Sequence, residues 1–150
     1  MTKTNLKEKL TILIAAKVDH EDRVRNIRST LSYLRYHFDV NVIISEQDTS
    51  SKLHDMCKAF QCRHIYIETD EFFNRQRGVN LAAREATTPV IAHYDADILL
   101  RPQQIIGATE AIVSGQAQMV YPYDGKFYDV PENYFNVIDM SKDLTKVDLD

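Results

Sequence analysis

The chain has 150 residues, of which 44% are hydrophobic and 27% charged, and its 18 basic and 22 acidic residues give a formal net charge of -4. This composition excludes a disordered chain, because enough apolar residues are present to fill one hydrophobic core. Residues 1–150 are therefore predicted to form a single globular domain. The excess of negative charge argues against general nucleic-acid binding.

The sequence contains no segment that would span or cross a membrane. No apolar run approaches the roughly 20 residues that a transmembrane helix requires. Residues 1–10 also lack the apolar stretch of a signal peptide. We therefore expect a cytoplasmic protein without a transmembrane segment, and leave a location at a membrane surface open.

The two cysteines, Cys57 and Cys62, do not indicate a disulfide scaffold. The nearby histidines His54 and His64 do not complete a recognised zinc-ligand spacing. The cysteines are predicted to be ordinary buried thiols.

The first two predicted elements are a buried strand and an amphipathic helix. Residues 11–16 form a continuous apolar run, which is typical of a strand buried on both faces of a parallel sheet. Apolar residues then recur at helical spacing from Val24 to Phe38. The acidic residues at 19–22 suit the positive end of this helix dipole.

Strand and helix patterns continue to alternate along the chain. Strands are predicted at residues 40–44, 64–67, 90–94 and 119–121, and helices around residues 53–60, 79–86 and 102–112. Residues 45–51 are predicted to form a polar loop that offers several helix N-caps. Residues 126–150 have aromatic side chains but no clear periodicity, and no element is predicted for them.

This alternation favours an α/β fold in which a mostly parallel sheet lies between two layers of helices. Ligands of such folds bind beyond the carboxyl ends of the strands. Polar residues at 18–19, 46–48 and 95–97 each follow an apolar strand pattern, so they are predicted to gather at that edge.

The chemistry of this edge is centred on Asp95 and Asp97, which only the small residue Ala96 separates. Both carboxylates can therefore approach one hard cation, and ligation by oxygen alone favours Mg²⁺ or Mn²⁺. A cation that keeps open positions can bind a diphosphate and neutralise the charge of a leaving nucleotide. The alternative is that both aspartates only punctuate a strand-to-helix turn, since Asp is common there.

Residues 74–99, NRQRGVNLAAREATTPVIAHYDADIL, resemble the central region of GT-A glycosyltransferases of the family 2 type. In that family a helix with Arg and Asn precedes a strand that ends in the D-x-D signature. The strand TILIAA and the segment VIISEQD resemble two earlier landmarks, so the resemblance covers residues 11–121. It implies a shortened GT-A fold, a UDP-linked nucleotide-sugar donor, Mn²⁺ or Mg²⁺, an inverting mechanism, and a glycan acceptor in polysaccharide or capsule synthesis.

The resemblance also implies roles for the acidic residues. Asp97 matches the metal ligand of the family, and Asp95 matches the partner carboxylate that contacts the ribose or a metal-bound water. Both are therefore the predicted metal pair. Glu46 matches the acidic residue that recognises the uracil ring, with Asp48 as its close rival.

Five further residues complete the predicted donor site, each with a plain structural alternative. Arg75 and Arg77 lie near the arginine that contacts the base or phosphate in the family, but a solvated helix start would explain them equally well. Asn80 could belong to the site or make a local backbone contact. Ala16 and Val18 match a loop that borders the base and are expected to serve in packing as well.

Two further features receive weaker assignments. His93 lies inside a predicted strand and is expected to be a core histidine without chemistry. Residues 121–125 would place aromatic rings near the same edge, where they could meet a sugar or form a structural tyrosine cluster.

The chain departs from the family pattern after the predicted fifth strand, where family members usually carry the acceptor site and the catalytic base. The carboxylates of the final segment stand in no motif of the family, and the base is left unassigned: Glu132, Asp139, Asp143, Asp148 and Asp150. Binding of the donor is therefore the first expectation for this chain, and transfer of the sugar is the second.

Three other functions are compatible with an α/β fold. A nucleotidyltransferase usually carries a glycine-rich phosphate loop after its first strand, whereas residues 15–23 contain no glycine. A dinucleotide-binding dehydrogenase is disfavoured because no G-x-G-x-x-G occurs. A non-catalytic α/β domain that binds a nucleotide or another protein is the stronger alternative.

Overall fold

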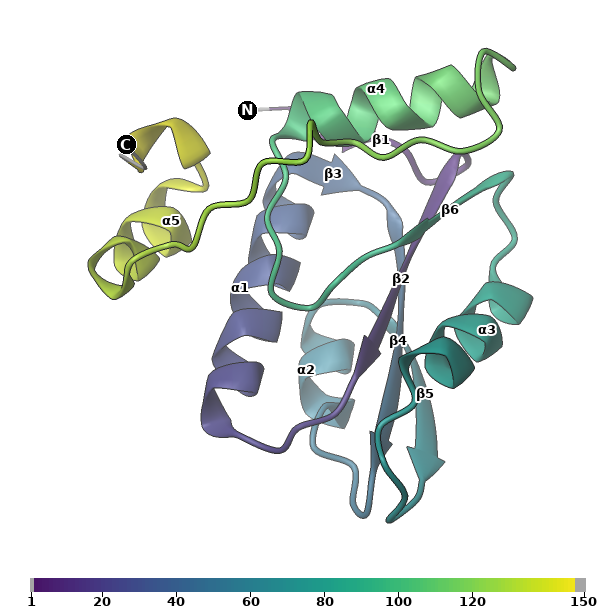
Figure 1. Cartoon of the computed structure of the whole chain (residues 1–150), viewed down its shortest axis with the longest axis vertical. Coiled ribbons are helices and arrows are strands. Elements are labelled where there is room, and N and C mark those ends of the chain that lie inside the picture. Colours follow the sequence, from purple (N-terminus) through teal and green to yellow (C-terminus); the bar gives the residue numbers. More distant parts are fainter. Residues whose placement is uncertain (1, 148–150) are drawn as a thin grey trace. The chain divides into compact units, whose positions relative to one another are not determined.

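The computed structural model describes residues 2–147, and the chain divides into two compact units between Ile98 and Leu99 (Figure 1). The sheet and the polar residues that follow its strands belong to the first unit. The prediction that residues 1–150 form one domain stays a prediction.

The first unit is built around a sheet of four parallel strands in the order β5-β4-β2-β6. The strands are β2 (Leu10–Ala16), β4 (Asn41–Asp48), β5 (Arg63–Glu68) and β6 (Val90–His93). Each lies where an apolar run predicts a strand. The predicted mostly parallel sheet is therefore confirmed.

Helices cover both faces of this sheet (Figure 1). Helices α1 (Glu21–His37) and α2 (His54–Ala59) lie on one face, and α3 (Arg75–Glu85) lies on the other. The predicted three-layer α/β/α architecture is therefore confirmed. Two short strands that the sequence did not predict, β1 (Thr4–Asn5) and β3 (Phe38–Asp39), pair in parallel beside it.

The core consists of the apolar residues whose spacing predicts strands and helices. On β2, the consecutive residues Ile12, Leu13 and Ile14 are all fully buried, as expected of a strand with helices on both sides. The inward stripe of α1 is equally buried: Ile27, Leu31 and Leu34. On the other face, α3 packs through small residues: Val79 and Ala82.

Strand β4 is longer than predicted, because residues 45–48 continue the strand instead of starting a loop. The four polar residues involved are all buried: Ser45, Glu46, Gln47 and Asp48. β4 pairs with β2 as far as Glu46 and with β5 as far as Asp48, so the backbone of residues 45–48 stays within the sheet. Hydrophobicity alone does not predict this extension.

The second unit is helical and contains the predicted helix α4 (Pro102–Val113). The final segment, for which the sequence predicts no element, forms η1 (Glu132–Tyr134), α5 (Phe135–Ser141) and η2 (Leu144–Lys146). Within residues 2–147, none of the helices has both the length and the apolar character needed to cross a bilayer.

The prediction of a fifth strand at residues 119–121 is wrong. These residues form no strand, and the side chains of Met119 and Tyr121 are 72% and 69% exposed. An apolar triplet carries too little pattern to distinguish a strand from an exposed loop.

Candidate functional site

The connections between the strands fix where a ligand is expected to bind in the first unit. From β2 the chain proceeds to β4 and β5 on one side, and it then returns to β6 on the other side of β2. Open α/β sheets bind ligands at such a reversal, beyond the carboxyl ends of the strands. The segments after β2 and β6 flank this point and contain Val18, Asp95 and Asp97.

The Asp95-Ala96-Asp97 turn is held to the first unit through its backbone. The backbone N–H of Tyr94 donates to the carbonyl of Leu13 at 2.9 Å. The buried hydroxyl of Thr30, from α1, donates to the carbonyl of Ala96 at 3.0 Å. The two carboxylates therefore flank a fixed residue.

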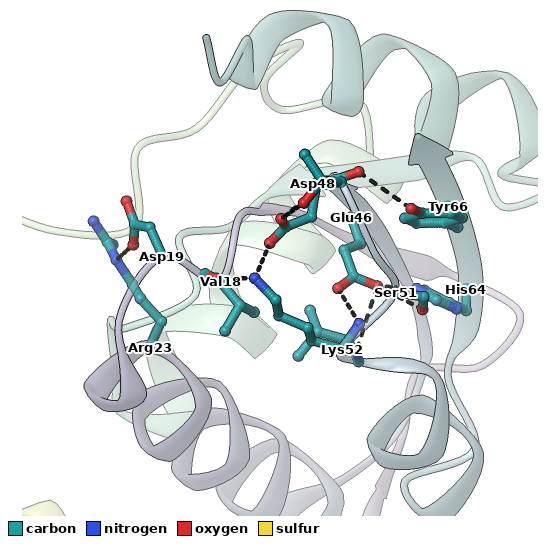
Figure 2. Close-up of polar contacts among 11 residues, drawn as sticks. Val18, Asp19, Arg23, Glu46, Asp48, Ser51, Lys52, His64 and Tyr66 are labelled. Carbon is teal, nitrogen blue, oxygen red and sulfur yellow. Dashed lines mark hydrogen bonds and ion pairs between the residues drawn. The ribbon is translucent and has the colours of Figure 1, made fainter. Parts of the chain in front are cut away.

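Each carboxylate of this turn contacts an arginine. Arg75 Nη1 lies 3.2 Å from Asp95 Oδ1, and Arg23 Nη1 lies 3.7 Å from Asp97 Oδ2. Arg23 also contacts Asp19 (Figure 2). The distance between Arg23 Nε and Asp19 Oδ1 is 3.5 Å. Sequence reasoning missed Arg23. The available signal was its position four residues after Asp19, a spacing at which opposite charges meet on a helix.

Glu46 is fully buried, and donors of its own chain surround its carboxylate (Figure 2). The backbone N–H groups of Lys52 and Leu53 donate to it at 2.6 and 3.3 Å. The Ser51 hydroxyl donates at 3.0 Å, and His64 Nε2 lies 2.9 Å away. These contacts anchor the start of α2, whose N-cap residue supplies no side-chain hydrogen bond.

Asp48, the rival of Glu46, takes part in a link between two loops (Figure 2). Lys52 Nζ donates to Asp48 Oδ2 and to the carbonyl of Val18, both at 2.8 Å. The loop after β4 is thereby tied to the loop after β2. The Tyr66 hydroxyl also donates to the Asp48 carbonyl at 3.2 Å.

A hollow of about 410 Å³ lies beside this link. The segment after β2, the start of α1 and one lysine line it: Val18, Asp19, His20, Glu21, Val24 and Lys52. Val18 is itself buried and borders this hollow, and its role beside a nucleotide base stays a prediction. Ala16 is buried in β2, where it pairs with Glu46 of β4.

The start of α3 is fixed by an amide clamp that sequence reasoning also missed. Gln47 Nε2 donates to the carbonyl of Asn74 at 2.7 Å, and the Asn74 N–H donates back to Gln47 Oε1 at 3.2 Å. The Asn74 side chain caps α3 by accepting from the Arg77 N–H at 2.9 Å. The position of Arg75, the first residue of α3, is therefore fixed by these contacts. Arg77 contacts Glu71 at 3.6 Å.

Comparisons with known proteins show the family of this chain. The model of glycosyl transferase family 2 matches residues 12–146 of the chain. The chain belongs to this family. No curated protein matches it at the level of sequence.

Two solved structures show the same fold as this family 2 member. The crystal structure of S. aureus TarS 1-349 is 12% identical with a TM-score of 0.54, and the match covers 72% of this chain and 33% of that one. The crystal structure of S. aureus TarS is 13% identical with a TM-score of 0.52, covering 72% and 20%. The chain therefore spans a third or less of the TarS chains it matches.

The donor set at the Asp95-Ala96-Asp97 turn fits a cation that shares its ligands with a substrate. Both donors are carboxylates, and their side chains are 38% and 43% exposed. Among residues 2–147, no cluster of three or more His, Cys, Asp or Glu side chains could enclose a metal. Mg²⁺ is commonly bound by one or two carboxylates, water and substrate phosphates, which matches this pair.

Three further features that the sequence singles out in this family 2 chain are Asn80, His93 and a pair of tyrosines. Asn80 is exposed, and its side chain accepts from Gln76 at 2.8 Å along the surface of α3. The prediction that His93 is a core residue is wrong, because it is exposed at the end of β6, an outer strand of the four-stranded sheet. In the second unit, Tyr121 and Tyr123 form an edge-to-face pair with centroids 6.2 Å apart.

The carboxylates of the final segment do not reveal a catalytic base. Asp139 contacts Lys142 at 3.8 Å, and Asp143 caps η2 by accepting from the Thr145 N–H at 3.0 Å. Glu132 lies exposed in η1. Asp148 and Asp150 lie outside the described residues.

The prediction of an ordinary buried thiol is confirmed for Cys57 but not for Cys62, which is only partly buried. Both thiols are free, with Cys57 buried and Cys62 partly buried. Burial, followed by the neighbouring Cys62 and Glu46, raises the pKa of Cys57 to about 12, so this thiol is protonated at neutral pH.

The contact between Asp48 and Lys52 makes the stability of the fold depend on pH in the acidic range. Burial alone would raise the pKa of Asp48, but the hydrogen bonds from Lys52 and Thr49 and the charge of Lys52 outweigh it and lower the pKa. A lowered folded-state pKa stabilises the fold above the ordinary pKa of Asp, near 3.9, and this stability is lost as the pH falls further. Asp48→Asn should therefore cost more stability at pH ~6 than at pH ~3.

Urea unfolding of both proteins at the two pH values measures this difference. Asp129→Asn, at an exposed position of the second unit, corrects for the loss of one negative charge. An equal cost of Asp48→Asn at both pH values would contradict the role of the Lys52 link.

Proposed function

We propose that this chain binds the nucleotide-sugar donor of a glycosyltransferase, a UDP-sugar, with Mn²⁺ or Mg²⁺ at Asp95 and Asp97. The sugar is destined for a glycan acceptor in polysaccharide or capsule synthesis. The observation that supports this most is the fixed turn after β6, where two half-exposed carboxylates lie beside arginines from α1 and α3. Carboxylate and guanidinium groups are the natural ligands of a cation and a diphosphate.

The nucleoside part of the donor is assigned to the hollow beside Val18 and Lys52. Pockets for nucleotides combine apolar walls with a few placed polar groups, and Val18 and Val24 provide the apolar part here. Of the two acidic candidates for the uracil ring, Asp48 is favoured, because it shares Lys52 with the hollow. Glu46 acts through the loop that it anchors.

A bound cation supplies Lewis-acid stabilisation of the leaving nucleoside diphosphate. The chain's residues hold the donor in one orientation: Asp95 and Asp97 from the turn after β6, Arg75 and Arg77 from the start of α3, and Asn80 along that helix. An inverting displacement also needs an acceptor hydroxyl that is deprotonated and in line. Donor binding is therefore the first activity to test, and transfer the second.

Titration calorimetry with UDP, in the presence and absence of Mn²⁺, tests the proposal. Asp97→Ala should weaken Mn²⁺-dependent UDP binding by about tenfold or more, equivalent to about 1.4 kcal/mol. Asp39→Ala is the control, because this exposed aspartate precedes β4 and lies at the amino ends of the strands. Equal UDP affinities for Asp97→Ala and the parent would refute the metal role.

The alternative, a domain that binds a nucleotide without catalysis, predicts a different outcome with a labelled UDP-sugar. That domain would retain the intact donor even when candidate glycans are supplied. Release or transfer of the sugar would favour the enzyme.

A further inference from the structure

The two arginines at the candidate site approach the Asp95-Ala96-Asp97 turn from opposite faces of the sheet. Arg23 lies in the first turn of α1 and contacts Asp97, whereas Arg75 is the first residue of α3 and contacts Asp95. Their side chains are 52% and 56% exposed. Each carboxylate that could bind a cation thus already has a cationic partner.

These contacts are weak enough to be exchanged. Half-exposed ion pairs at 3.2 and 3.7 Å contribute little to stability, because water screens the two charges. A divalent cation competes for the same oxygens with twice the charge. The arginines therefore lower the affinity for a free cation without preventing its binding.

Arg23 has a second anchor that keeps it at the site after such an exchange. Its Nε lies 3.5 Å from Asp19, four residues earlier. Asp19 also lines the hollow assigned to the nucleoside. A guanidinium released from Asp97 but retained by Asp19 would stay beside the donor. There it could donate two parallel hydrogen bonds to phosphate oxygens, which is the usual geometry of an arginine–phosphate contact.

We propose that Arg23 and Arg75 are ligands of the donor's diphosphate that rest on Asp97 and Asp95 until a cation takes their place. This inference rests on the proposed function and adds Arg23 to the site. Its consequence is coupling: the cation alone must displace the arginines, whereas the cation with a diphosphate gives them new partners. Mn²⁺ and UDP therefore strengthen each other's binding, and by linkage the effect is reciprocal.

The test is the Arg23→Gln variant, with two separate measurements. Electron paramagnetic resonance of free Mn²⁺ measures its affinity for the protein without nucleotide, and calorimetry measures UDP affinity at saturating Mn²⁺. Affinity for Mn²⁺ alone should rise about two- to fivefold, because a competing ion pair is gone. Affinity for UDP should fall about tenfold, because a charged contact to phosphate is lost. Arg23→Lys, which keeps the charge, should lie between the parent and Arg23→Gln in both.

Arg28→Gln is the matched control, since Arg28 is an exposed arginine of the same helix. It should leave both affinities at the parent's values. If Arg23→Gln raises the affinity for Mn²⁺ alone and lowers the affinity for UDP, the inference is supported. Simple damage to the fold would weaken the binding of both ligands. No change, or a change in the same direction for both, would overturn it.

The Asp97→Ala variant separates this inference from the proposed function. If that variant loses Mn²⁺-dependent UDP binding while Arg23→Gln matches the parent, only the exchange of arginines is wrong. If Asp97→Ala binds UDP and Mn²⁺ as the parent does, the metal site itself is wrong and the inference falls with it.

Discussion

Gly78→Val should destabilise the protein by about 3 kcal/mol, near the upper end of the usual cost of overpacking. A Cβ atom at Gly78 would lie 2.5 Å from Ser45 Oγ, 2.9 Å from Gln47 Nε2 and 3.0 Å from Ala15 Cβ. Ser45 and Gln47 are buried in β4, so neither can move into solvent. Helix α3 would have to shift away from the sheet, and the candidate site would shift with it.

Gly107→Val in α4 is the matched control, because a Cβ atom there meets nothing within 4 Å. Glycine and valine are both poor helix formers, so this change should stay within about 0.5 kcal/mol. Thermal unfolding should show a fall of roughly 6–12 °C for Gly78→Val, at about 2–4 °C per kcal/mol for a chain of this size. Similar melting temperatures for the two variants would contradict the close packing of α3.

The parts of the fold that the sequence predicts well are those whose signal lies within one element. The continuous apolar run of β2 and the helical stripe of α1 each need no information from elsewhere in the chain. The location of the ligand-binding end of the sheet can be predicted from these elements, because parallel strands bring their carboxyl ends together. The position of the Asp95-Ala96-Asp97 turn could therefore be predicted.

The end of β4 could not be predicted, because its partners come from distant segments. Glu46 meets His64 of β5, and Gln47 clamps Asn74 before α3. Each side chain is polar, so residues 45–48 resemble a solvated loop when they are considered alone. Burial becomes favourable only when every donor and acceptor has a partner, which is a property of the folded chain.

The same limit applies to the candidate site. The spacing of Asp95 and Asp97 reveals the carboxylate pair, but nothing in the sequence brings Arg23 to Asp97. The four-residue spacing at the start of α1 favours only the contact between Arg23 and Asp19, which precedes the helix. Residue pairs that are far apart in sequence require the fold itself.

The largest effect on stability is expected for Glu46→Ala, at about 3–5 kcal/mol, the usual cost of removing one partner from a buried charged network. The Glu46 side chain is fully buried and contacts Ser51, His64 and the backbone N–H groups of Lys52 and Leu53. Alanine would leave these groups without their acceptor inside the protein. Urea unfolding measures the loss, and Glu68→Ala, at an exposed position of β5, is the control.

The same variant distinguishes two roles for Glu46, since its contacts favour an anchor and family resemblance favours a reader of the uracil ring. An anchor orients Lys52, so its loss should reduce stability and weaken UDP and CDP binding by the same factor. A base reader should change the preference between UDP and CDP, because the two rings differ in the hydrogen bonds that their edges make. A stable Glu46→Ala protein with altered base preference would therefore refute the anchoring role and transfer base recognition from Asp48 to Glu46.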